Sequence, residues 1–131
     1  MAISEGTKLA KSWRGEYDFA VDGGAISTIV LRSNDGPIPA GSYIVSGVLD
    51  ILTLFTTGTA AVAALTVEAA NDIVSSTIVS GAPYSTTGLK SIIPAGTGAT
   101  AVKTTVTRAP SIVIATGTIT AGKCRLVLFY N

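Results

Sequence analysis

The sequence predicts an all-β protein, an antiparallel β-sandwich of about eight strands, with a jelly roll as the expected form. Short runs rich in Val, Ile and Thr alternate with turns rich in Gly, Pro, Asn and Asp. No amphipathic helix of useful length is visible. The chain also lacks an internal repeat of 20–50 residues, which argues against solenoids and propellers. Together these observations favour two packed sheets.

Four strands are expected in the first half of the chain, each followed by a turn. Asp22-Gly23-Gly24 supplies one tight turn, because glycine tolerates a positive φ. The long apolar run 43–55 fits a strand or a helix; its β-branched residues and flanking turns favour a strand bent near Gly47. The expected strands are Tyr17–Val21, Ala25–Arg32, Tyr43–Phe55 and Ala61–Ala69.

The second half predicts five further strand candidates, shorter and separated by loops around Pro83, Pro94 and Pro110. These candidates are Asp72–Ser80, Leu89–Ile93, Ala101–Thr107, Ser111–Thr116 and Lys123–Tyr130. Residues 1–14 are polar, basic and without period, so we expect an extended N-terminal arm at 1–14 and a sandwich domain at 15–131.

Low charge predicts association with other proteins. Apolar residues make up 47% of the 131 residues and charged residues only 13%, about half the usual charged share. Few surface charges give weak protection against association, so an oligomer or a larger assembly is expected. The alternative is a monomer kept soluble by its Ser and Thr hydroxyls.

The net charge of +1 gives no reason to expect nucleic-acid binding. Residues 80–131 carry five basic residues and no acidic one, whereas residues 15–79 are strongly acidic. Opposite charge in the two halves could attract neighbouring copies or place complementary strands side by side. No apolar signal segment or membrane-spanning run is visible, so we expect a cytoplasmically made protein with no membrane partner.

The residue types needed for most catalysis are scarce. The chain has no His, one Cys and eight carboxylates, so we expect no enzyme, no cofactor and no metal. Cys124 fits a small core residue in the last strand. Two alternatives stay open at this point: a calcium site at Asp18, Asp22 and Asp35, and a hydrolase that uses Glu68 and Asp72.

Two aromatic residues are candidates for contact with a partner. Trp13 ends the predicted arm, where it either packs back on the domain or anchors the arm elsewhere. Tyr84 lies in a loop and is the best candidate for an exposed contact, more plausibly with protein than with a small ligand.

Four segments in this order, YDFAVDGGAISTIVL, PIPAGSYIVSGVLDILTLFTTG, LTVEAANDIV and GAPYSTTG, resemble a family of small structural proteins of tailed bacteriophages. The resemblance covers roughly residues 17–130. It implies a non-enzymatic capsid decoration or cement protein on the virion head surface, made in the host cytoplasm. The implied partners are the major capsid protein and further copies, as a homotrimer or homodimer.

Within that resemblance, the expected contacts come from the arm and from two loops, 37–41 and 83–87. The candidate residues are Lys8, Lys11, Trp13, Arg14, Pro37, Pro39, Pro83 and Tyr84. The alternative function is a receptor-binding module of a tail, baseplate or fibre. Such a module needs an exposed aromatic and amide cluster, for which Trp13, Tyr84 and Asn71 are available.

Overall fold

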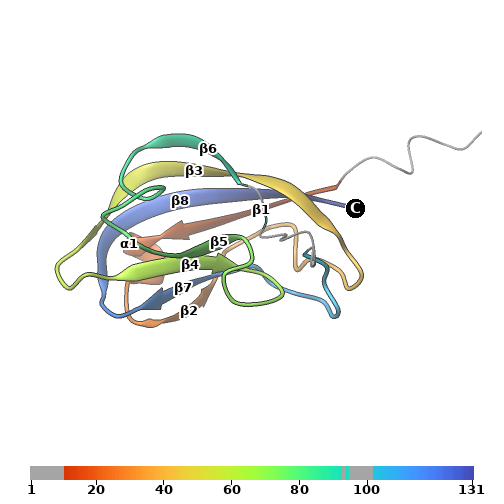
Figure 1. Cartoon of the computed structure of the whole chain (residues 1–131), viewed down its shortest axis with the longest axis horizontal. Coiled ribbons are helices and arrows are strands. Elements are labelled where there is room, and N and C mark those ends of the chain that lie inside the picture. The colour runs from red at the N-terminus through yellow and green to blue at the C-terminus, as the bar shows by residue number, and fades with distance from the viewer. Residues whose placement is uncertain (1–10, 93, 95–101) are drawn as a thin grey trace, which may run out of the picture.

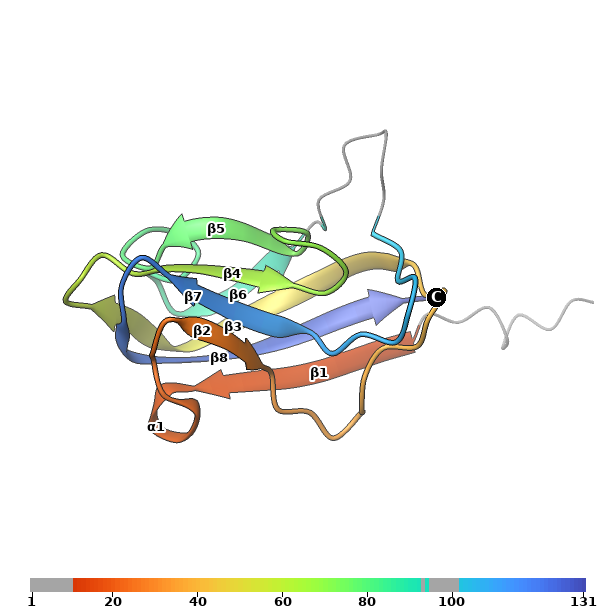
Figure 2. The same ribbon diagram turned by 90° about the horizontal axis from the view of Figure 1, so that it is seen from below.

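Two four-stranded antiparallel sheets pack face to face in the computed structural model, which describes residues 11–92, 94 and 102–131 (Figures 1 and 2). The predicted all-β sandwich of eight strands is therefore confirmed. The elements are β1 (Lys11–Asp18), α1 (Phe19–Asp22), β2 (Ser27–Val30), β3 (Ile44–Thr57), β4 (Val62–Thr66), β5 (Val74–Ile78), β6 (Gly88–Ile92), β7 (Ser111–Ala115) and β8 (Ile119–Tyr130).

The strand order shows how the chain is wound. One sheet, here sheet A, has the order β1-β8-β3-β6, and the other, sheet B, has the order β2-β7-β4-β5. The first strand therefore pairs with the last, the second with the seventh, the third with the sixth and the fourth with the fifth. This nested pairing follows the strand order of a jelly roll.

Alternation along each strand places the core between the two sheets. In β8, Cys124, Leu126 and Leu128 are buried, while the residues between them face outward. Ile112 and Ile114 of β7 cover them from sheet B. Burial raises the pKa of the Cys124 thiol to about 12, so this cysteine is an unreactive core residue, as the sequence predicts.

The boundary predicted for the N-terminal arm is wrong at residues 11–14. These residues form the first half of β1 and pair with Val127–Tyr130 of β8. The strand is hard to recognise because its inward positions are Trp13, Gly15 and Tyr17, and only two of these are large. Residues 1–10, including the predicted contact Lys8, lie outside the described residues.

Two other predictions differ from the structure. Phe19–Asp22 is a single helical turn, not the end of a strand, because the Asp18 carboxylate accepts a hydrogen bond from Ala20 N at 3.0 Å and caps it. The expected strand 101–107 is absent from the part that is described, 102–107. Only isolated bridges join this segment to its surroundings, as at Lys103 with Tyr43.

In the described part of the chain, no helix is long and apolar enough to cross a membrane.

Candidate interaction site

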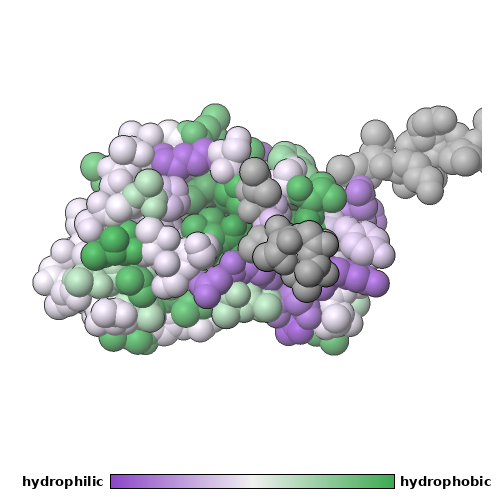
Figure 3. All heavy atoms as spheres, viewed as in Figure 1, coloured by the Kyte–Doolittle hydropathy of each residue, from purple (hydrophilic) through white to green (hydrophobic). Residues whose placement is uncertain are grey.

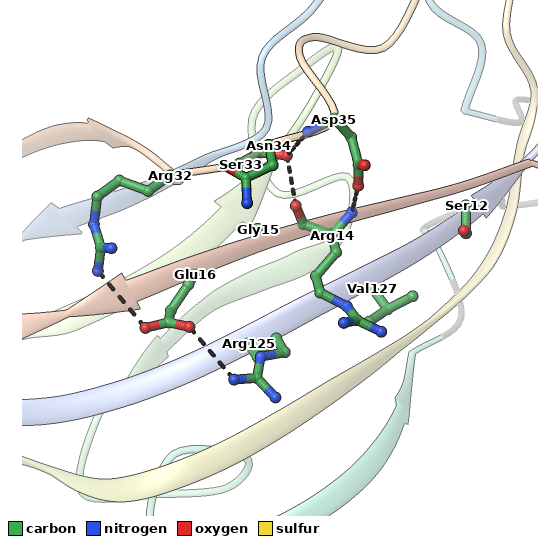
Figure 4. Close-up of a pocket in the computed structure, with 10 residues that line it drawn as sticks. All are labelled: Ser12, Arg14, Gly15, Glu16, Arg32, Ser33, Asn34, Asp35, Arg125 and Val127. Atoms are coloured by element: carbon green, nitrogen blue, oxygen red, sulfur yellow. Dashed lines mark hydrogen bonds and ion pairs between the residues drawn. The ribbon is translucent and has the colours of Figure 1, made fainter.

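A shallow groove of about 430 Å³ lies on the outer face of sheet A, between β1, β8 and the segment that follows β2 (Figure 4). It contains the predicted contact residue Arg14 together with polar residues from three parts of the chain. The groove is lined by Ser12, Arg14, Gly15, Glu16, Arg32, Ser33, Asn34, Asp35, Arg125 and Val127.

Trp13 forms the support beneath this groove. Its side chain is 2% exposed, and its ring lies so close to Gly15 that a Cβ atom there would be 2.1 Å from the ring. The indole Nε1 donates a hydrogen bond to the Gly36 carbonyl oxygen at 2.7 Å. Packing and hydrogen bonding together therefore hold the loop after β2 against β1.

Hydrogen bonds between β1 and the segment after β2 fix the wall of the groove. The backbone N–H of Arg14 donates to the Asp35 carboxylate at 2.8 Å, and the Ser33 hydroxyl donates to the Arg14 carbonyl. The Asp35 N–H in turn donates to the Ser33 hydroxyl at 3.0 Å. The Arg14 side chain is left exposed above Val127 (Figure 4).

Glu16 is the centre of the charge network in the groove. Its carboxylate lies 3.5 Å from Arg125 and 3.8 Å from both Arg32 and Lys123. Arg32 also pairs with Asp22 at 3.0 Å, and this hydrogen bond raises the pKa of the Arg32 guanidinium. Such exposed pairs each contribute about 0–1 kcal/mol, so they orient the side chains more than they stabilise the fold.

The structure brings together only some of the predicted contact residues. Lys11, Arg14, Pro37 and Pro39 are exposed at one end of the sandwich, where β1 begins (Figure 1). Pro83 lies apart from them and is half-buried. It lines a second hollow of about 240 Å³, with apolar side chains between the edges of the two sheets (Figure 3).

The prediction of Tyr84 as an exposed contact is wrong. Of the two alternatives for Trp13, the structure shows the first, since this residue packs back on the domain and is not an exposed contact. Tyr84 is 0% exposed, its ring centroid lies 5.1 Å from that of Phe55, and its hydroxyl donates to the Ala63 carbonyl. A tyrosine in a Pro- and Ser-rich loop looks exposed in the sequence, but this loop turns Tyr84 into the core, where its carbonyl oxygen also accepts a hydrogen bond from Phe55 N at 3.3 Å. Asn71 is exposed, yet its amide oxygen already accepts a hydrogen bond from Ser76 N.

Sequence reasoning also missed Tyr43. This residue is 51% exposed, and the Lys103 ammonium lies 5.2 Å from its ring centroid, a cation–π arrangement. Its place before a long apolar run suggested a buried strand residue. The available signal was Pro39-Ala40-Gly41 just upstream, which puts Tyr43 at the start of the strand, next to the loop.

Glu68 and Asp72 do not form a catalytic pair. The Asp72 carboxylate accepts three backbone hydrogen bonds, from Val67, Glu68 and Ala69, at 2.8–2.9 Å. The Glu68 carboxylate accepts hydrogen bonds from Arg108 and Thr105, which lower its pKa from 4.5 to about 2. A carboxyl that stays ionised down to this pH cannot act as a general acid near neutrality.

The calcium alternative is also weakened by local contacts. Asp18 caps the helical turn, and Asp22 pairs with Arg32 and accepts the Asp18 N–H. Asp35 is held to the backbone of Arg14, on another part of the surface. Across residues 11–92, 94 and 102–131, no three side chains of the His, Cys, Asp and Glu types are grouped to hold a metal.

Stability should fall in acid because of Glu68. Its folded-state pKa of about 2 lies below its ordinary 4.5, so its contribution is complete above pH 4.5 and is lost as the pH falls toward 2. Acid titration of the wild type, followed by circular dichroism, should show this loss. Glu68→Gln should flatten that part of the pH profile, and an unchanged profile in this variant would contradict the assignment.

Known proteins resemble this chain in structure, but no match is found by sequence. No family model matches the chain, and no curated protein matches it. A chain of the cyanophage Pam1 capsid asymmetric unit superposes with a TM-score of 0.63 at 17% identity, covering 99% of this chain and 91% of that one.

Two further capsid structures contain similar chains. In the capsid of Ralstonia phage GP4, the TM-score is 0.63 at 16% identity, with 92% of this chain and 83% of that chain covered. In the acid-stable capsid of Helicobacter pylori bacteriophage KHP30, the TM-score is 0.61 at 10% identity, with 93% and 86% covered. At these identities the likeness establishes the fold.

Proposed function

We propose that this chain is a structural protein of a bacteriophage particle, a decoration or cement protein that binds across junctions between capsid subunits and stabilises the head. The observation that carries the proposal is the likeness over 92–99% of the chain to chains of three phage capsids. The shortage of catalytic side chains and the low charge support a role based on shape and packing. Many copies on one lattice would turn modest contacts into firm attachment.

The end of the sandwich where β1 begins is the proposed contact surface for the capsid. It combines the exposed residues Arg14, Pro37 and Pro39 with Tyr43 and Lys103 (Figure 1). Tyrosine and arginine are the residue types that most often dominate binding energy at interfaces. The hydrogen bonds around Asp35 and Trp13 hold this end in one conformation, which reduces the entropy lost on binding.

The first experiment is quantitative mass spectrometry of purified particles of the source phage. The proposal expects hundreds of copies in each particle. A few copies would favour the alternative, a tail or baseplate component, and absence from particles would rule out a virion role.

A binding experiment then tests the contact surface. Tyr43→Ala should bind about tenfold more weakly than the wild type to phage particles that lack this protein. The reason is that tyrosine is enriched among the few interface residues whose truncation costs more than about 1 kcal/mol. The matched control is Leu89→Ala, which removes another exposed apolar side chain, on the edge strand β6 opposite Asp50 in the middle of β3, and should bind normally. Equal binding by both variants would move the contact surface elsewhere.

A further inference from the structure

One arginine of this chain has no acidic partner among the described residues. The chain has four arginines, and three of them, Arg32, Arg108 and Arg125, each lie within 3.5 Å of a carboxylate oxygen. The fourth, Arg14, forms no ion pair with a carboxylate in the described part of the chain. Its side chain is exposed and lines the polar groove on the outer face of sheet A. A guanidinium group in this situation is available to an anion from another molecule.

A second guanidinium group, that of Arg125, lies on the same face of the sheet. In the register of β1 against β8, Arg14 is opposite Val127, and Arg125 is two positions from Val127. The two arginines are therefore diagonal neighbours, close enough for long side chains to act together. Figure 4 shows both side chains extending over β8, with Val127 beside that of Arg14. The groove thus presents two sets of N–H donors next to an apolar side chain.

The acidic side chains around the groove gather mainly at one end, where they are already paired. Their ion-pair network comprises Glu16, Asp18, Asp22, Arg32, Lys123 and Arg125. Nearer the beginning of β1, the carboxylate in the lining is that of Asp35, which accepts the backbone N–H of Arg14 at 2.8 Å. The positive charge of the Arg14 side chain is therefore left without an ion pair in the described part of the chain.

A single carboxylate suits this arrangement better than other anions. It can accept two parallel hydrogen bonds from one guanidinium group, which is a strong and specific geometry. A phosphate carries up to about two negative charges, and the second charge would be repelled by the carboxylates of Glu16 and Asp35 in the lining. A nucleic-acid strand would bring further phosphates along β1, toward Glu16 and Asp18. The methylene groups of an aspartate or glutamate side chain, by contrast, can pack on Val127.

We propose that this groove binds an acidic side chain of the capsid surface, an aspartate or a glutamate, between the guanidinium groups of Arg14 and Arg125. The inference rests on the proposed function and names the chemistry of its partner. Because Ser12 and Asp35 line the groove, it reaches the end of the sandwich where β1 begins, and one partner can contact both surfaces. The hydrogen bond between Asp35 and the backbone of Arg14 holds the groove in shape before binding, which favours affinity.

Binding of the purified full chain to phage particles that lack this protein is the first test. Arg14→Ala should bind about tenfold more weakly than the wild type, because arginine is enriched among the residues that dominate interface energy. Arg14→Lys should recover only part of the loss, since lysine keeps the charge but not the paired donors. The matched control is Lys90→Ala, which removes the same charge on the edge strand β6 and should bind normally. Added salt should weaken binding of the wild type more than binding of Arg14→Ala.

A nuclear magnetic resonance titration tests the groove without the particle. The probe is a short glutamate peptide, and a glutamine peptide of the same length is its control. Only the glutamate peptide should shift the side-chain N–H signals of Arg14 and Arg125 in the wild type. In Arg14→Ala, the shift at Arg125 should be lost or strongly reduced.

The two experiments separate this inference from the proposed function. If Arg14→Ala binds particles as tightly as the wild type while Tyr43→Ala does not, the carboxylate site is wrong and the proposed function stands. Equal weakening in Arg14→Ala and Lys90→Ala would also overturn the site, because it would show an effect of net charge alone. If the wild type does not bind particles, the proposed function is wrong, and the titration decides the groove. Equal shifts with both peptides, or no shift with either, would overturn the carboxylate site.

Discussion

Replacing Trp13 with alanine is expected to lower the free energy of unfolding by about 3–5 kcal/mol, the usual cost of removing a buried aromatic side chain. The ring is almost fully buried, covers Gly15 and donates to the Gly36 carbonyl. Its loss opens a cavity and releases the loop after β2. Because small domains are stable by only about 5–15 kcal/mol, this single change should bring the fold close to its limit.

Urea denaturation followed by circular dichroism is the appropriate measurement, because Trp13 is the only tryptophan and its removal eliminates the fluorescence signal. Trp13→Phe is the matched control. It retains an aromatic ring but loses the hydrogen bond to Gly36, so its cost should be clearly smaller than that of alanine. A Trp13→Ala variant as stable as the wild type would contradict the burial of this side chain.

Asp72→Ala is expected to lower the free energy of unfolding by about 2–3 kcal/mol. The carboxylate is the acceptor for the backbone N–H groups of Val67, Glu68 and Ala69, and it is itself buried. Removing it leaves these donors without a protein acceptor, and each buried unpaired group costs about 1–3 kcal/mol. Water can reach Ala69, which limits the total.

Asp72→Asn separates the contribution of the hydrogen bonds to stability from the contribution of side-chain volume. An asparagine retains one acceptor oxygen, so it can keep the bond to Val67 and should lose less stability than alanine. Thermal unfolding of the two variants beside the wild type measures this order. Equal midpoints for all three proteins would show that the turn between β4 and β5 does not depend on Asp72.

The strands that could be predicted from the sequence are those whose inward positions hold large apolar residues. β3, β7 and β8 are rich in Ile, Leu, Val and Phe, and a turn precedes each of them in the sequence. For these elements, the local pattern and the tertiary environment agree. The strand count and the sandwich followed from them.

β1 and the segment after residue 101 could not be predicted for opposite reasons. In β1, burial depends on a ring that folds over a glycine, and no period in the sequence reveals that contact. Residues 102–107 have strand-like composition, but only isolated bridges join them to the loop before β3. β-propensity describes fit to a neighbouring strand, and here the neighbour is missing along most of the segment.

The candidate site was predicted only in part because its residues meet through long-range pairing. Arg14, Pro37 and Pro39 were predicted as partner contacts and are exposed in the structure, whereas the exposed Tyr43 was missed. Glu16 and Arg125 are more than 100 positions apart, and only the register of β1 against β8 makes them neighbours. Sequence spacing carries no information about such a contact.

The position of β8 between β1 and β3 has a consequence for synthesis. The strand that joins the two halves of sheet A is the last of the eight described strands to be synthesised, so a nascent chain that ends before Ile119 has β1 and β3 without their common partner. Folding must therefore wait until β8 has left the exit tunnel, and the many long-range pairings should make it slow, in milliseconds to seconds. During that wait, the uncharged strands of sheet B lack the other sheet that covers their inner face, which exposes the chain to aggregation.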